Sequence, residues 1–156
     1  MILASLINSL SVVPHYRLFT NQTAGNSQTR FYFPHDEFYD ASTSETVFEI
    51  AHRARPNAVV AVETPTLFEY YAQQAGREDL IFVSLSDKSK VANLSADDFI
   101  IYTKGRRYFS NENYLNYLEN SVKPVAEIKI GEVISAKIYR LDKTFAAHIQ
   151  NSAKQN

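Results

Sequence analysis

The stretch AVVAVETPTLFEYYAQQAGREDLIFVSL, from Ala58 to Leu85, decides the fold. Its first part, Ala58–Val62, is an uninterrupted apolar run, as expected of a strand covered on both faces. Thr64-Pro65 is typical of a helix start, and Gly76 fits the C-terminal cap of that helix. Leu80–Leu85 is a second apolar run. The stretch therefore predicts a strand, a helix and a second buried strand.

Further elements are predicted on both sides of this unit. Upstream, Ser42 and Glu45 have the spacing of a capping box, and Pro56 blocks the continuation of the helix that they begin. Downstream, the predicted elements are a short polar helix or turn around Ser95–Asp98, a strand at Phe99–Thr103, a helix capped by Ser110 or Asn111, and strands Val125–Ile130 and Val133–Leu141 joined at Gly131-Glu132.

The alternation of strands and helices predicts an α/β domain. We expect a three-layer Rossmann-like sandwich whose mainly parallel sheet ends in an antiparallel hairpin. Residues 14–142 form this single domain, and residues 143–156 are expected as a polar C-terminal tail, helical near Phe145–Ile149 and frayed.

The first 13 residues contain no charged side chain. Their larger apolar residues, Ile2, Leu3, Leu6, Ile7 and Leu10, share one helical face. Two interpretations follow: a helix docked on the core, or the end of a transmembrane helix whose remainder lies outside this sequence. The segment alone is shorter than the roughly 20 apolar residues that span a bilayer.

Composition excludes several kinds of site. The 156 residues contain no cysteine, which rules out disulfides, Cys-ligated zinc and a thiol nucleophile. The net charge is −1, so a nucleic-acid partner is not expected. Residues 1–80 contain five Lys or Arg and nine Asp or Glu, whereas residues 81–156 contain eleven and eight. An acidic and a basic lobe are therefore possible.

The strongest candidate for ligand binding follows the predicted strand Phe99–Thr103. In an open α/β sheet, ligands bind beyond the carboxyl ends of the strands. Glu63 stands at one such end, and Lys104, Gly105, Arg106 and Arg107 stand at another, just before a helix. Guanidinium groups and backbone N–H groups in that arrangement can bind a phosphate or carboxylate. The alternative is a solvated turn whose cations pair with nearby carboxylates.

A second candidate is the aromatic stretch Phe31–Asp40, FYFPHDEFYD, which has neither a strand nor a helix period. It contains ligand-type groups at His35, Asp36, Glu37 and Asp40, but their spacing matches no known metal loop, so no metal site is predicted. The chain also lacks a G-x-G-x-x-G or Walker motif, so no cofactor is expected. No glycine elbow surrounds any serine, so no nucleophilic serine is predicted.

Several motifs, in this order, resemble one protein family. They are Pro14-His15-Tyr16-Arg17-Leu18 with Asn21 and Ala24-Gly25, then Phe33–Asp40, Glu63-Thr64-Pro65 with Tyr70-Tyr71, Gly76–Leu80, and Gly105–Asn111. The pattern resembles the C-terminal extracytoplasmic domain of polytopic bacterial glycosyltransferases of the protein-mannosyltransferase, or dolichyl-phosphate-mannose-type, class. It covers most of residues 12–141, and Gly25-Asn26 departs from it where two glycines are expected.

The resemblance implies a function for this chain. It implies a non-catalytic accessory domain of a membrane-bound glycosyltransferase that uses a polyprenyl-phosphate sugar, placed on the extracytoplasmic (periplasmic) face. The catalytic residues of that family lie in the transmembrane bundle, which is the implied partner within the same polypeptide. This domain would cover the active site or recognise the acceptor glycan or the lipid phosphate. The residues expected to do so are Lys104, Arg106, Arg107, Asn111, Phe31, His35, Asp36, Glu37, Tyr39, Asp40 and Glu63.

Two other functions are compatible with the same residues. A free-standing α/β enzyme would unite Glu63, Asp87 and an arginine in a deep pocket with perturbed pKa values. A structural interaction module would use the aromatic loop to seal the sheet edge and would leave the basic turn in solvent.

Overall fold

A computed structural model describes residues 40–105, 107–130 and 133–154, the last three by their backbone only. The strands are β1 (Val59–Val62), β2 (Ile81–Ser84), β3 (Phe99–Thr103), β4 (Ala126–Ile130) and β5 (Val133–Arg140). The helices are α2 (Thr43–Arg53), α3 (Pro65–Gln74), α4 (Lys88–Val91), the 3-10 turn η4 (Phe109–Asn111), α5 (Glu112–Ser121) and α6 (Lys143–Lys154). Both interpretations of residues 1–13, and the aromatic stretch before Asp40, lie outside the described residues.

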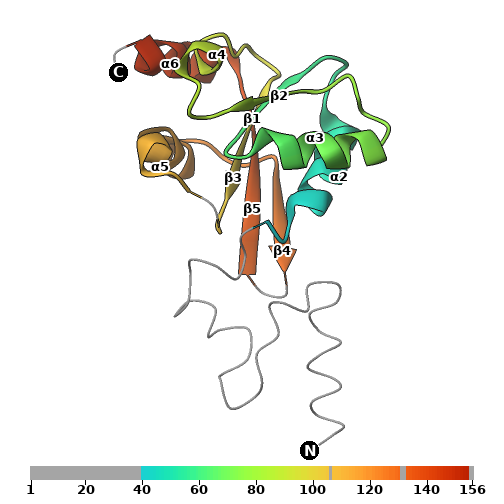
Figure 1. Cartoon of the computed structure of the whole chain (residues 1–156). Coiled ribbons are helices and arrows are strands. Elements are labelled where there is room, and N and C mark those ends of the chain that lie inside the picture. The colour runs from blue at the N-terminus through green and yellow to red at the C-terminus, as the bar shows by residue number, and fades with distance from the viewer. Residues whose placement is uncertain (1–39, 106, 131–132, 155–156) are drawn as a thin grey trace, which may run out of the picture.

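The five strands form one sheet in the order β2-β1-β3-β5-β4. β1 pairs in parallel with β2 and β3, whereas β5 runs antiparallel to both β3 and β4. Figure 1 shows α2 and α3 on one side of the sheet and α4, α5 and α6 on the other. The predicted fold class, a Rossmann-like α/β sandwich with an antiparallel hairpin at one end, is confirmed.

Two hydrophobic clusters hold the three layers together. Under α2 and α3 the cluster includes Val47, Ile50, Phe68, Phe99 and Ile138. Under α4, α5 and α6 it includes Ile100, Leu115, Leu118, Tyr139 and Ile149. The sheet contributes alternate side chains to each cluster because successive residues of a strand point to opposite faces.

β2 is a buried strand, as the apolar run Leu80–Leu85 predicted, but it lies at the edge of the sheet. Its residue Ile81 is 50% exposed. Phe82 and Val83 are buried under the helices of the two faces. An edge strand can therefore have an apolar sequence, because helices cover both of its faces even though no strand pairs with one of its sides.

The start of α2 uses different bonds from the predicted capping box. Ser42 is the N-cap residue, but its side chain makes no capping hydrogen bond. Its hydroxyl oxygen instead accepts a bond from the hydroxyl of Ser135 on β5, at 2.8 Å, and both serines are buried. Ser42 thus ties α2 to the sheet, a role that local spacing does not encode.

Two helices extend beyond the sequence expectations. α4 was not predicted, and its N-cap is Asp87, whose carboxylate accepts a bond from the backbone N–H of Lys90. The segment expected as a polar tail, helical near Phe145–Ile149, forms the longer helix α6, in which Phe145, Ala146 and Ile149 are buried. Three apolar side chains on one helical face are enough to dock α6 on the core. Among the described residues, no helix has both the length and the apolar character needed to cross a membrane.

The C-terminal end of α3 has the predicted glycine cap. Gly76 has a positive φ of 68°, and the backbone N–H of Arg77 bonds to the carbonyl of Ala72 at 2.8 Å. A Cβ atom added at Gly76 would meet no atom within 4 Å, so only the backbone conformation requires glycine here.

Replacing Gly76 with alanine is therefore expected to lower the free energy of unfolding by about 1 kcal/mol, which chemical denaturation can measure. Asparagine, which tolerates a positive φ, should lose less. An alanine variant as stable as the parent protein would contradict this backbone explanation.

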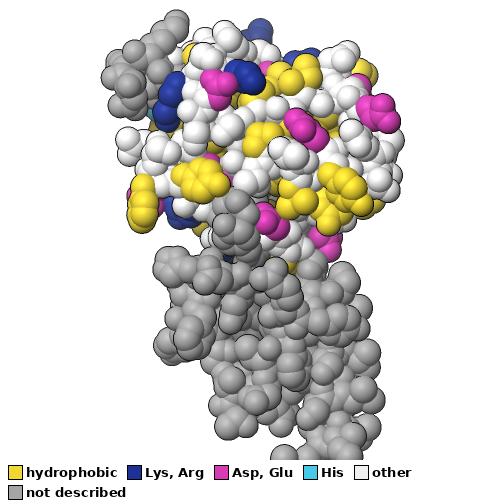
Figure 2. All heavy atoms as spheres, viewed as in Figure 1, with side chains coloured by type: hydrophobic (Ala, Val, Ile, Leu, Met, Phe, Trp, Pro, Cys, Tyr) yellow, Lys and Arg dark blue, Asp and Glu magenta, His cyan; other side chains and the backbone are white. Residues whose placement is uncertain are grey.

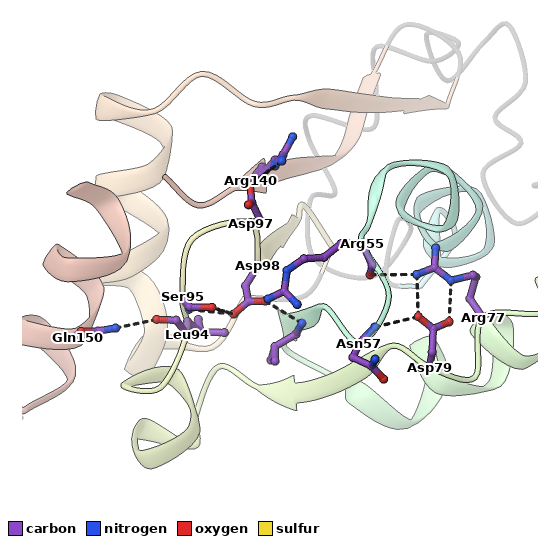
Figure 3. A network of polar contacts seen from close by, with 11 residues as sticks. Arg55, Asn57, Arg77, Asp79, Leu94, Ser95, Asp97, Asp98, Arg140 and Gln150 are labelled. Atoms are coloured by element: carbon purple, nitrogen blue, oxygen red, sulfur yellow. Dashed lines mark hydrogen bonds and ion pairs between the residues drawn. The ribbon is translucent and has the colours of Figure 1, made fainter. Parts of the chain in front are cut away.

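Two charged networks lie at the end of the sheet where β1 begins (Figure 3). In one, Arg77 forms a two-point pair with Asp79, at 2.7 and 2.9 Å, and also donates to the carbonyl oxygens of Ala51 and Arg55. Asp79 additionally accepts from the backbone N–H of Asn57 at 3.0 Å. In the other network, the buried Asp98 bonds to the start of β1 and to Ser95.

The Arg77–Asp79 pair predicts acid sensitivity. The hydrogen bonds from Arg77 and then from Asn57 hold the pKa of Asp79 well below its usual range. A carboxyl group with a lowered folded-state pKa stabilises the fold above its unfolded pKa of about 4, and this contribution is lost as the pH falls below that value. We expect carboxyl NMR titration to find Asp79 still ionised at pH 3, and Arg77→Lys, which loses the two-point geometry, to raise its pKa. Equal titration in both proteins would disprove this assignment.

Candidate functional site

The candidate site lies at the opposite end of the sheet, beyond the carboxyl ends of the parallel strands. Glu63 follows β1 directly and is only 6% exposed. One of its carboxylate oxygens accepts a bond from the backbone N–H of Tyr108 at 3.1 Å, and the other accepts from the side-chain amide of Asn111 at 2.7 Å. A buried carboxylate is thus bonded to the loop that connects β3 to α5.

Asn111 is the second centre of this network. It is completely buried and is the N-cap residue of α5, yet its side chain makes no capping bond. Its amide nitrogen donates to Glu63 and, at 3.1 Å, to the hydroxyl of Ser86 beyond β2. The expected helix-capping role of Asn111 is therefore replaced by bonds that join segments following all three parallel strands.

The loop presents two aromatic side chains to solvent. Phe109 is 92% exposed and Tyr108 is 41% exposed. Lys88, on α4, donates a hydrogen bond to the carbonyl of Ser110 at 3.3 Å, and its ammonium lies 4.3 Å from the ring centre of Tyr114. The site therefore combines a buried hydrogen-bond network, centred on Glu63 and Asn111, with a rim of exposed aromatic and basic side chains, those of Tyr108, Phe109 and Lys88.

Arg107 points away from this rim toward α5. It donates to Asn116 at 3.0 Å and lies 3.6 Å from the carboxylate of Glu119, which also pairs with Lys137 of β5 at 2.9 Å. Its guanidinium is 5.1 Å from the ring centre of Tyr102. The alternative in which the cations pair with nearby carboxylates thus applies to Arg107, although its Nε–H is buried and has no hydrogen-bond partner among the described residues.

Two tyrosines under this cluster have raised pKa values. Burial is the main cause for both, and the negative charge of Glu119 adds to it. The pKa of Tyr139 rises to about 12, and that of Tyr102 rises less because Arg107 and Lys137 oppose the shift. Both phenols are therefore neutral at physiological pH and serve as packing groups.

The structure brings several of the predicted site residues to the same end of the sheet. Glu63 and Asn111 are in contact, and Lys104 begins the same loop, its backbone N–H bonded to the carbonyl of Ser135 at 2.8 Å. Asp40 lies at the start of α2, where its carbonyl accepts from the backbone N–H of Thr43; Ser42, two residues further on, is bonded to Ser135, the same residue whose carbonyl accepts from Lys104. The remaining residues, Phe31, His35, Asp36, Glu37, Tyr39 and Arg106, lie outside the described part of the chain.

The residues that sequence reasoning missed are partners in long-range contacts. Ser86, which follows β2, bonds to Asn111, 25 residues away, and no local pattern marks it as a partner. Glu119 and Lys137 are 18 residues apart, on α5 and β5. No local pattern marks such pairs, because they depend on which helix covers which strand.

Other parts of the described chain offer weaker candidates. Asp87, which an enzyme pocket would have used, caps α4, and the bonds from Ser89 and Lys90 lower its pKa. No group of three metal-ligand side chains occurs among the described residues. A groove of about 330 Å³ runs beside β2 and α3, with Glu69, Glu78 and Ile81 in its lining, on a different side of the molecule from Glu63.

Comparison of the chain with protein-family models, curated proteins and solved structures finds no match. The function is therefore inferred from the residues and their geometry.

Proposed function

We propose that this chain is a non-catalytic accessory domain of a membrane-bound glycosyltransferase that takes its sugar from a polyprenyl phosphate. The proposed role is recognition of the lipid phosphate or of a glycan at the loop Lys104–Asn111. The transmembrane bundle would belong to the same polypeptide, and the domain would lie on the extracytoplasmic side. The motif resemblance supports the family, and the site geometry supports the role.

The observation that carries this proposal is the contact between Glu63 and Asn111. These residues belong to two of the motifs in the resemblance, lie 48 positions apart, and meet at 2.7 Å in a buried hydrogen bond. Breaking this hydrogen bond would leave a buried carboxylate and a buried amide without a partner, which costs free energy. The contact therefore favours the one loop conformation in which both groups are paired. A loop held in this way can present its exposed groups to a ligand with little loss of conformational entropy.

The same contact argues against catalysis by Glu63. A general base must reach the proton that it removes, within hydrogen-bond distance. Both carboxylate oxygens of Glu63 already accept bonds from the protein, and the residue is buried. Glu63 is thus suited to positioning the loop, which fits an accessory domain better than a free-standing enzyme.

Amide NMR titration of the 156-residue chain with a short, water-soluble polyprenyl phosphate, and separately with candidate oligosaccharides, tests the proposal. Shifts confined to residues 104–111 and their neighbours are expected for one of the two ligands. Lys104→Ala should weaken the response, and Lys143→Ala, a change at an exposed lysine on α6, should not.

The absence of shifts with millimolar ligand would overturn ligand recognition and leave the interaction-module alternative. In the complete gene product, removal of residues 40–154 should lower sugar transfer while leaving the membrane part inserted. Unchanged transfer would refute an accessory role.

A further inference from the structure

The most exposed large hydrophobic side chain of the described residues is Phe109, at 92%. Burial of a phenylalanine contributes roughly 1.5–3 kcal/mol, which this residue forgoes in the isolated chain. It stands in η4, a one-turn element too short to be stable by itself. Contacts among the described residues of this chain therefore do not explain why Phe109 is exposed.

The protein holds Phe109 in this exposed position by bonds on both sides. The residue before it, Tyr108, donates its backbone N–H to Glu63, and the residue after it, Ser110, accepts from Lys88 through its carbonyl. Asn111, one position further, is fully buried. A loop anchored at three close neighbours cannot fold its phenyl ring inward without breaking a buried charged contact.

The charges near Phe109 differ from those near the other exposed aromatics. Lys88 and Lys104 flank the loop and keep part of their surface exposed, and one carboxylate, that of Glu112, follows at the start of α5. Tyr70, on α3, is 55% exposed beside Glu69, which lines the groove of β2 together with Glu78 and with Arg77, and Arg77 is paired with Asp79. Figure 2 shows exposed hydrophobic side chains in several separate groups, including one over α2 and α3, and not in one broad patch. The two aromatic surfaces thus share their exposure but differ in the balance of charge beside them: two lysines and Glu112 near Phe109, and Glu69, Glu78 and the Asp79-paired Arg77 near Tyr70.

We propose that Phe109 and Tyr108 form a membrane-contact tip that enters the interface of a bilayer with anionic head groups. Aromatic rings prefer the head-group level of a bilayer, and basic side chains beside them are attracted to anionic lipids. The two lysines beside Phe109 favour this partner, whereas the carboxylates of Glu69 and Glu78 near Tyr70 would be repelled by it. The inference rests on the proposed function, because it supplies the surface by which such a domain would lie against its membrane.

Attachment through this tip alone would be weak and reversible. One buried side chain and a few cations give only modest binding, so stable attachment takes a second anchor. A domain linked to a transmembrane bundle needs no more than this, because the linkage makes the contact intramolecular.

A tryptophan reporter tests the proposal, because the natural chain contains no tryptophan. We would prepare the full chain as Phe109→Trp and, as a matched control, as Tyr70→Trp, and titrate each with vesicles of phosphatidylglycerol mixed into phosphatidylcholine. The emission of the tryptophan at position 109 should move to shorter wavelength and be quenched by brominated lipid, whereas the tryptophan at position 70 should not respond. The N-terminal apolar segment is the same in both proteins, so a difference between them reports on position 109.

Binding measured by vesicle sedimentation adds a second readout. Phe109→Ala should lower the partition coefficient about tenfold, and Lys104→Ala about fivefold. Raising the salt concentration to about 0.5 M should weaken binding of the parent chain, since it screens the cations.

Three results would overturn the proposal: no response at position 109, an equal response at position 70, or a spectral shift that depends on protein concentration without lipid. The last would identify a second copy of the chain as the partner. Failure here is distinguishable from failure of the proposed function, because the soluble polyprenyl phosphate and the oligosaccharides of that test need no bilayer.

Discussion

Replacing Asp98 with alanine is expected to lower the free energy of unfolding by about 4 kcal/mol, the largest effect of any single substitution considered for this protein. Asp98 is 1% exposed. One carboxylate oxygen accepts from Arg55 and from the backbone N–H of Val59, each at 3.0 Å, and the other accepts from the N–H and the hydroxyl of Ser95, at 2.8 and 2.9 Å. Alanine would leave all four of these partly buried donors without an acceptor.

The loss of stability in each variant depends on how many of the hydrogen bonds to position 98 remain. In Asp98→Asn the amide side chain would keep one acceptor oxygen but would aim an NH₂ group at the donors on the other side, so this variant should lose about 2–3 kcal/mol. Arg55 is 44% exposed, and Asp98 keeps its backbone donors without it, so Arg55→Ala should lose only about 1 kcal/mol. Chemical denaturation of the three variants should give this order.

The adjacent residue supplies a matched control. Asp97 pairs with Arg140 at 2.5 Å, but both side chains are about half exposed, and Asp97 has a positive φ of 71°. Asp97→Asn removes the ion pair and keeps a residue type that tolerates this backbone, so the loss should stay below about 1 kcal/mol. Comparable losses at positions 97 and 98 would contradict the importance assigned to the buried network.

Replacing Glu63 with alanine is expected to cost about 3 kcal/mol and to release the loop Lys104–Asn111. The backbone N–H of Tyr108 and the amide of Asn111 would lose their acceptor in a buried place. Hydrogen exchange at Tyr108 should therefore accelerate more than exchange in β1, which the sheet protects independently. Ligand shifts at residues 104–111 should weaken in parallel.

A double-mutant cycle with Asn111→Ala isolates the contact itself. A hydrogen bond to a charged group contributes about 1.5–3 kcal/mol, so the two substitutions should be non-additive by that amount. Ser110→Ala, which removes only a bond of 3.4 Å at an exposed position, should change stability by less than about 0.5 kcal/mol. Additive effects of the changes at 63 and 111 would show that the carboxylate does not hold the loop.

Local patterns were sufficient for the secondary structure of the central unit. The apolar run Ala58–Val62, the Thr64-Pro65 start and Gly76 each act within a few residues, and the structure has β1, α3 and its cap at these places. The strand Phe99–Thr103 was predicted at its observed bounds for the same reason. The short α4 was missed because four residues are too few to show a helical period.

Side-chain roles were predicted less well than secondary structure. Ser42 and Asn111 both stand at N-cap positions, where their residue types usually bond to the helix backbone. The hydroxyl of Ser42 bonds to Ser135 and the amide of Asn111 bonds to Glu63, because buried polar groups brought close by the fold take the strongest available partner.

The sequence by itself thus determined the α/β class, the order of the elements apart from the short α4, and the strand ends at which Glu63 and Lys104 stand, because periodicity, proline and glycine act locally. Only the tertiary structure decided that β2 is an edge strand, that α6 docks on the core, that Arg107 turns toward Glu119 and that Glu63 holds the loop of Phe109. These outcomes depend on contacts between residues far apart in the chain, and such contacts exist only once the layers have packed.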